Sequence, residues 1–166
     1  MKNEPGDSAP AGAPRHRSST IRSQRIYTGK VLNLDLDDVR FPNGRTGRLE
    51  LIRHSGAAAV LPFLDEPNDL QARVLLIRQF RYAADRFLYE IPAGRLDAGE
   101  APMDCARREL LEEAGYSADR LVPLGGFFTT PGFIDEFIHL FLASGLTSGT
   151  ASPEVDEFIH PESQPL

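Results

Sequence analysis

Three glutamates lie close together in the chain at a spacing that suits metal binding. Glu109, Glu112 and Glu113 stand at i, i+3 and i+4, so on a helix their side chains crowd one face. Carboxylates at this spacing repel one another, and a hard divalent cation with oxygen ligands, Mg²⁺ or Mn²⁺, would relieve the repulsion. The alternative is a solvated acidic face paired with Arg107 and Arg108.

The residues around these glutamates predict a helix from about Pro102 to Ala114. Pro102 suits the first helical turn, where its missing N–H costs nothing, and Gly115 suits the left-handed position after the last turn. Apolar residues recur at helical spacing along one stripe, at Met103, Ala106, Leu110 and Ala114. The helix is therefore expected to pack by this stripe and to present the carboxylates beside it.

The longer pattern over residues 94–116 reads G-x5-E-x7-R-E-x-x-E-E-x-G. Seven fixed identities, each at about 7% usage, coincide by chance about once in 10⁸ windows. The pattern resembles the signature of the Nudix hydrolases, with Tyr116 where that family carries an aliphatic residue. The resemblance covers about residues 25–159.

Within that family the chain resembles the ADP-ribose pyrophosphatases. Residues 78–82 (RQFRY) and 90–94 (EIPAG) are similar to segments of that subgroup, and Pro131 lies 16 residues past Gly115. The resemblance implies Mg²⁺-dependent hydrolysis of ADP-ribose to AMP and ribose 5-phosphate by a metal-activated water. The alternatives are hydrolysis of another nucleoside-diphosphate sugar such as GDP-mannose or ADP-glucose, a non-catalytic protein that binds nucleotide sugars, and a truncated remnant without function.

The resemblance also implies roles for particular residues. The implied metal ligands are the carbonyl of Ala93 and the carboxylates of Glu109, Glu112 and Glu113. Arg108 is expected to orient a glutamate through a charge-assisted hydrogen bond. The implied substrate-binding residues are Arg48, Arg81, Pro131 and Gly132, with solvated charge as the alternative for the arginines. Glu154 and Glu157 are the two candidates for the general base.

Composition limits the kinds of partner and compartment. The 166 residues are 41% hydrophobic and carry a net charge of −6, which argues for a soluble domain and against nucleic-acid binding. A single cysteine, Cys105, excludes an internal disulfide framework and is expected to be a buried structural thiol. No apolar run approaches the roughly 20 residues that span a membrane, and the N-terminus does not resemble a signal peptide, so we expect a cytoplasmic protein.

Hydrophobic patterning predicts an α+β fold, an α/β/α sandwich around a mixed sheet, in the domain at residues 21–159. Residues 1–20 are expected to be a disordered tail. Strands are predicted over 25–54, with Leu32, Leu34 and Leu36 facing inward and a hairpin turn at residues 43–44. Further strands are predicted at 57–64, 74–78, 87–91, 121–129 and 136–143.

The end of the chain departs from the family pattern. Residues 160–166 contain two prolines and polar residues, so they are predicted to be an irregular tail that supplies neither the last strand nor the C-terminal helix of the family. In relatives the N-terminal strands cross to a second subunit. The resemblance therefore implies a homodimer through those strands, with a small-molecule nucleoside-diphosphate sugar as the substrate.

Overall fold

The computed structural model describes residues 18–152 and 158–166. The chain divides after Ile52 into two compact units, which are described separately. The described residues form ten strands, one α-helix and one short 3-10 helix: β1 (Ser19–Thr28), β2 (Asn33–Arg40), β3 (Thr46–Arg53), β4 (Ala57–Pro62), β5 (Arg73–Arg81), η1 (Tyr82–Ala84), β6 (Arg86–Glu90), β7 (Ala93–Arg95), α1 (Pro102–Ala114), β8 (Tyr116–Phe128), β9 (Phe137–Ser148) and β10 (Ile159–Pro165). Neither helix in these ranges is long and apolar enough to cross a membrane.

The first unit is a three-stranded sheet in the order β1-β2-β3. β1 runs antiparallel to β2, with Ser19 opposite Arg40. The turn between β2 and β3 is closed by the N–H of Gly44, which donates to the Phe41 carbonyl at 2.9 Å. Gly44 has a φ of 82°, a left-handed conformation that glycine adopts without strain. The predicted hairpin at residues 43–44 is therefore confirmed.

The buried face of β2 is not the predicted one. The residues with the least exposure are Asp35, Asp37 and Val39, at 7%, 1% and 8%, whereas Leu34 and Leu36 are half-buried. Asp35 forms an ion pair with Arg25 on the neighbouring strand β1. A carboxylate paired in this way tolerates burial, so the alternation of leucines alone gave the wrong face.

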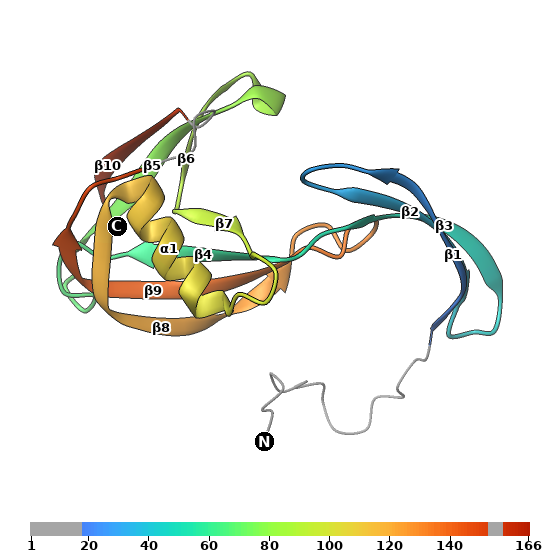
Figure 1. Cartoon of the computed structure of the whole chain (residues 1–166). Coiled ribbons are helices and arrows are strands. Elements are labelled where there is room, and N and C mark those ends of the chain that lie inside the picture. The colour runs from blue at the N-terminus through green and yellow to red at the C-terminus, as the bar shows by residue number, and fades with distance from the viewer. Residues whose placement is uncertain (1–17, 153–157) are drawn as a thin grey trace, which may run out of the picture. The chain divides into compact units, whose positions relative to one another are not determined.

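The second unit contains two sheets and the helix. One sheet has the order β7-β4-β9-β8 and the other the order β10-β5-β6. β4 and β9 run parallel, while every other pair in the two sheets runs antiparallel, so the predicted mixed sheet is confirmed. Figure 1 shows α1 lying across the strands of this unit, and it is the single α-helix of the described residues. The hydrophobic core between α1 and the two sheets consists of apolar residues from α1 (Cys105, Ala106, Leu110, Ala114), β4 (Ala58, Val60), β5 (Leu75, Ile77), β8 (Leu121) and β9 (Phe141, Ala143).

The C-terminal residues form a strand, so the prediction of an irregular tail at 160–166 is wrong. β10 pairs antiparallel with β5 from Ile159 opposite Gln79 to Pro165 opposite Arg73. The N–H of Leu166 donates to the Ala72 carbonyl at 3.0 Å. Because hydrogen-bonded pairs alternate along an antiparallel ladder, residues 160, 162 and 164 also lie at hydrogen-bonded positions. Pro161 and Pro165 therefore fall at positions whose N–H would face the open edge, where proline is tolerated.

Candidate active site

The helix that carries the glutamates begins and ends at the predicted residues. α1 starts with Pro102, and Gly115 follows its last turn with a φ of 71° and an N–H directed at the carbonyls of Leu110 and Leu111. Two glutamates lie on its buried side, with exposures of 8% for Glu109 and 3% for Glu113. Carboxylates this deeply buried need partners.

Strand β7 supplies part of the contact surface for these carboxylates. The N–H of Ala93 donates to Oε2 of Glu113 at 2.8 Å. At the next residue, a Cβ on Gly94 would lie 1.8 Å from Oε1 of Glu109, so any side chain there would displace the carboxylate. The glycine at position 94 is therefore explained by the close approach of the β7 backbone to α1.

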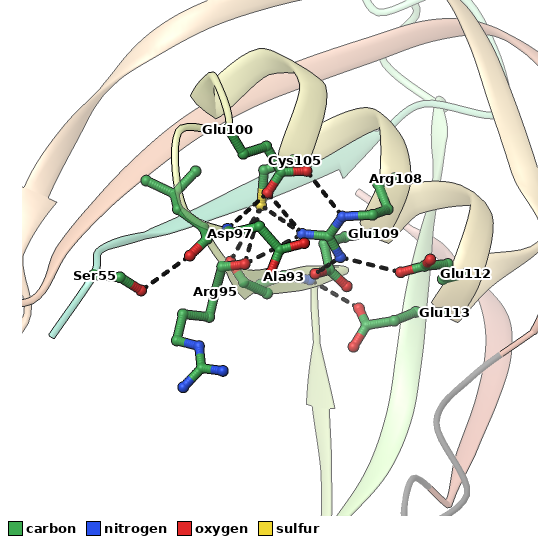
Figure 2. Close-up of polar contacts among 12 residues, drawn as sticks. Ser55, Ala93, Arg95, Asp97, Glu100, Cys105, Arg108, Glu109, Glu112 and Glu113 are labelled. Atoms are coloured by element: carbon green, nitrogen blue, oxygen red, sulfur yellow. Dashed lines mark hydrogen bonds and ion pairs between the residues drawn. The ribbon is translucent and has the colours of Figure 1, made fainter. Parts of the chain in front are cut away.

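Arg108 links the carboxylates to one another (Figure 2). Its Nη1 donates to Oε1 of Glu109 at 2.6 Å and to Oε2 of Glu112 at 3.1 Å. Its Nε and Nη2 donate to the two oxygens of Glu100, each at 2.9 Å, and Nη2 also reaches the Arg95 carbonyl at 3.2 Å. These hydrogen bonds, above all those to Glu100, raise the pKa of Arg108.

Two residues of this cluster were not among the predicted site residues. Glu100 accepts both bonds of the Arg108 fork, and this pairing lowers its pKa to about 2. The thiol of Cys105 lies 3.5 Å from the Gly94 carbonyl, and burial, followed by the charge of Glu100, raises its pKa to about 12. Glu100 could have been predicted as a site residue, because it is one of the seven identities of the signature. No sequence signal indicated that the Cys105 thiol lies against the Gly94 carbonyl.

The donor chemistry of the cluster fits a hard divalent cation. The carboxylates of Glu100, Glu109 and Glu112 pair with one guanidinium, and Glu113 accepts from the Ala93 N–H. This surplus of negative charge and oxygen donors is what such an ion requires. In the part of the chain that the structure describes, no three acidic, histidine or cysteine side chains converge as metal ligands. The carboxylates are instead directed at Arg108 and at the N–H of Ala93.

The two predicted substrate-binding arginines each form a two-pronged pair with a carboxylate. At the end of β5, Arg81 donates from Nε and Nη2 to the two oxygens of Glu90, at 2.9 and 2.7 Å. Arg48 belongs to the first unit, where it donates to Asp38 at 2.7 and 3.3 Å, and this bond lowers the pKa of Asp38. Both arginines are exposed.

Two of the remaining predicted residues lie in the connection between two strands. Pro131 and Gly132 are exposed in the turn between β8 and β9, and a Cβ on Gly132 would have no neighbour within 4 Å. Glu154 and Glu157, the two candidates for the general base, lie outside the described residues. On either side of them, the N–H of Ser152 donates to the Glu112 carbonyl at 2.9 Å, and the N–H of Phe80 donates to the Phe158 carbonyl at 3.3 Å.

Comparison with known proteins identifies the family. A family model described as the NUDIX domain matches residues 53–164. The chain belongs to the Nudix hydrolases. The matched range begins where the second unit begins and includes most of β10. Enzymes of this family generally need a divalent metal.

The chain is also similar to individual proteins. The chain is 43% identical to an ADP-ribose pyrophosphatase of Bacillus subtilis (strain 168), over 83% of this chain and 72% of that protein. It is 41% identical to a methanol dehydrogenase activator of Bacillus methanolicus, over 84% of this chain and 74% of that protein. A crystal structure of an ADP compounds hydrolase superposes with a TM-score of 0.73 at 20% identity, covering 90% of this chain and 78% of that one, which confirms the Nudix fold.

Proposed function

We propose that this Nudix enzyme hydrolyses the diphosphate bond of ADP-ribose to AMP and ribose 5-phosphate and that it requires Mg²⁺, with Mn²⁺ as a substitute. The observation that carries the proposal is the pair of buried glutamates, Glu109 and Glu113, packed against the β7 backbone within a cluster that has more carboxylates than cations. The similarity to an ADP-ribose pyrophosphatase of Bacillus subtilis supports this choice of substrate.

In this proposal Glu109, Glu112, Glu113 and the Ala93 carbonyl hold the divalent ions. Bound ions would neutralise the diphosphate and lower the pKa of a water molecule. Arg108 keeps Glu109 and Glu112 in place with one edge of its guanidinium, while Glu100 fixes the other edge. Such an arrangement positions charge before the substrate arrives, so the chain avoids reorganising its carboxylates during the reaction.

The substrate diphosphate is assigned to Arg81, with Arg48 in a supporting role. The planar fork of an arginine matches two phosphate oxygens as well as it matches a carboxylate. Arg81 already donates from Nε and Nη2 to Glu90, so a diphosphate would compete with Glu90 for the same two donors. Pro131 and Gly132 are assigned to the substrate, and Glu154 or Glu157 to the general base, on the family resemblance.

We also propose that the active form is a homodimer built through the N-terminal strands. All ten residues of β1 are exposed, and they include the apolar side chains of Ile21, Ile26 and Tyr27, each more than half exposed. A long exposed strand with apolar side chains is a ready pairing surface for another chain.

The proposal is tested with a panel of nucleotide sugars. ADP-ribose, ADP-glucose and GDP-mannose are each incubated with the enzyme in Mg²⁺, Mn²⁺, Ca²⁺ or excess chelator, and the nucleoside monophosphate released is quantified by chromatography. ADP-ribose is expected to give the highest kcat/KM, with activity in Mg²⁺ and Mn²⁺ and none in Ca²⁺ or chelator. Preference for another sugar would overturn the choice of substrate, and full turnover in chelator would overturn the metal assignment.

A further inference from the structure

Two loops of the proposed site lie at the same edge of the four-stranded sheet. In that sheet β4 lies between β7 and β9. Ala57, the first residue of β4, stands opposite Arg95 at the end of β7 and opposite Ile138 near the start of β9. The signature loop that follows β7 (residues 96–101) and the β8–β9 loop (residues 129–136) therefore both lie beside the residues that precede β4.

The β8–β9 loop is closed by its own hydrogen bonds. The N–H of Thr129 donates to the Glu136 carbonyl at 3.3 Å, and Oγ1 of Thr129 donates to Oε2 of Glu136 at 2.8 Å. Inside the loop, the N–H groups of Phe133 and Ile134 donate to the Thr130 carbonyl at 3.2 and 3.1 Å. The two loop residues that the proposed function assigns to the substrate lie within this closed turn, so whatever fixes the turn also fixes them.

Asp135 ties the β8–β9 loop to residues 53–56, which precede β4. Its Oδ1 accepts from the N–H of His54 at 2.8 Å, and its Oδ2 accepts from Nη1 of Arg53 at 3.2 Å. The bond from the N–H is charge-assisted. The ion pair with Arg53 is 35% and 42% exposed on its two side chains, and pairs this exposed contribute little. The bond to the His54 backbone is therefore the main tether.

The same short segment also contacts the signature loop. Oγ of Ser55 donates to the Leu96 carbonyl at 3.1 Å (Figure 2), and the N–H of Leu96 donates to the Gly56 carbonyl at 3.1 Å. One residue earlier, the Arg95 carbonyl accepts from Nη2 of Arg108 at 3.2 Å. The residues before β4 therefore connect the β8–β9 loop to the loop that holds the carboxylate cluster.

We propose that Asp135 is a positioning residue for the substrate. By accepting from the N–H of His54, it fixes the β8–β9 loop relative to the carboxylate cluster, so that a nucleoside-diphosphate sugar contacts the loop and the metal ions together. A loop that is held in place beforehand does not have to be ordered when the substrate binds, which improves binding. This inference rests on the proposed function, and Asp135 acts through the loop without touching the substrate.

The first test separates KM from kcat. Asp135→Ala removes both bonds and is expected to raise the KM for ADP-ribose about tenfold, while kcat and the Mg²⁺ concentration for half-maximal activity stay within about twofold. Asp135→Asn keeps an oxygen that can accept from the His54 N–H, so its KM should stay within about threefold of wild type. An unchanged KM in Asp135→Ala, or a loss confined to kcat, would overturn the proposal.

Asp65 provides the matched control, because it makes the same kind of contact in a loop that the proposed function does not use. It accepts from the N–H of Arg73 at 3.0 Å and from the Arg73 guanidinium at 2.8 and 2.9 Å. Asp65→Ala is expected to lower Tm at least as much as Asp135→Ala but to leave KM unchanged. An equal rise in KM for both variants would indicate a general loss of stability and would overturn the proposal.

Hydrogen exchange tests the tether without substrate. Amide exchange over residues 130–134 is expected to be at least about tenfold faster in Asp135→Ala than in wild type, because the loop opens more often once it is untied. In Asp65→Ala it should match wild type. Unchanged exchange in Asp135→Ala would show that other contacts hold the loop and would overturn the proposal.

Failure of the proposed function is distinguishable from failure of this inference. If wild type hydrolyses ADP-ribose but its KM does not depend on Asp135, the inference fails and the proposed function stands. If wild type hydrolyses no nucleotide sugar, the proposed function fails, and Asp135 is then judged by calorimetric titration with ADP-ribose. Weaker binding to Asp135→Ala than to wild type and Asp65→Ala would support the inference, whereas equal binding to all three proteins, or none, would overturn it.

Discussion

The guanidinium of Arg108 is shared among three carboxylates, those of Glu100, Glu109 and Glu112. Arg108→Lys keeps the charge but removes the planar fork, so it cannot hold all three at once. The expected loss is about 1–3 kcal/mol in the free energy of unfolding, measured by urea denaturation, with at least about tenfold lower kcat. The control is Arg107→Lys, since Arg107 donates to the Ala118 carbonyl at the surface; equal effects of the two substitutions would contradict the account.

The Glu100–Arg108 pair predicts a specific acid dependence of stability. Pairing lowers the pKa of Glu100 from its ordinary 4.5 to about 2, so the ionised carboxylate stabilises the folded state above pH 4.5. This contribution is lost as the pH falls from about 4.5 to about 2. The Tm difference between wild type and Glu100→Gln should be largest near neutral pH and should vanish by about pH 2. A difference that stays constant across this window would show that the charge is unimportant.

At the same scale, sequence reasoning found the reactive groups but not what holds them. The spacing of Glu109, Glu112 and Glu113 is visible because it depends on neighbours along one helix. The fork between Arg108 and Glu100 depends on how the loop before α1 folds back, which no local pattern specifies. The contact between Gly94 and Glu109 joins two elements and likewise needs the fold.

At the scale of elements, local signals were sufficient for α1 and insufficient for β10. Pro102 and Gly115 mark the ends of α1 through their own backbone preferences. Proline in a strand has no such fixed meaning, since its effect depends on whether the missing N–H would face a neighbour or the open edge. The sequence alone does not show that β10 is an edge strand, or whether Pro161 lies at a hydrogen-bonded or a non-hydrogen-bonded position of the ladder.

Proline substitutions at neighbouring positions of β10 test this explanation. Ser163, like Pro161 and Pro165, lies at a position whose N–H faces the open edge, whereas Gln164 lies at a hydrogen-bonded position opposite Val74. Ser163→Pro is expected to change the free energy of unfolding by less than about 1 kcal/mol, and Gln164→Pro to lower it by more, because a ladder hydrogen bond is lost. Urea denaturation measures both. The reverse order would show that the register of β10 differs from the one described.

At the scale of the whole molecule, the exposed apolar residues of β1 predict self-association. Light scattering coupled to size exclusion is expected to give twice the chain mass of 18.3 kDa. Replacing Ile21 and Ile26 with serine should shift the mass toward that of one chain, because the apolar pairing surface is removed. A single-chain mass for the wild type across micromolar concentrations would contradict the homodimer.

The measurement that tests the central claim most directly is turnover of ADP-ribose by wild type and Glu113→Gln in saturating Mg²⁺. Glutamine keeps an oxygen that accepts the Ala93 N–H and relieves repulsion with Glu109, so Tm should hold or rise slightly. The loss of a metal-binding carboxylate should lower kcat by at least about 100-fold. A folded Glu113→Gln variant with wild-type turnover would contradict the assignment of the α1 carboxylates as the hydrolytic centre.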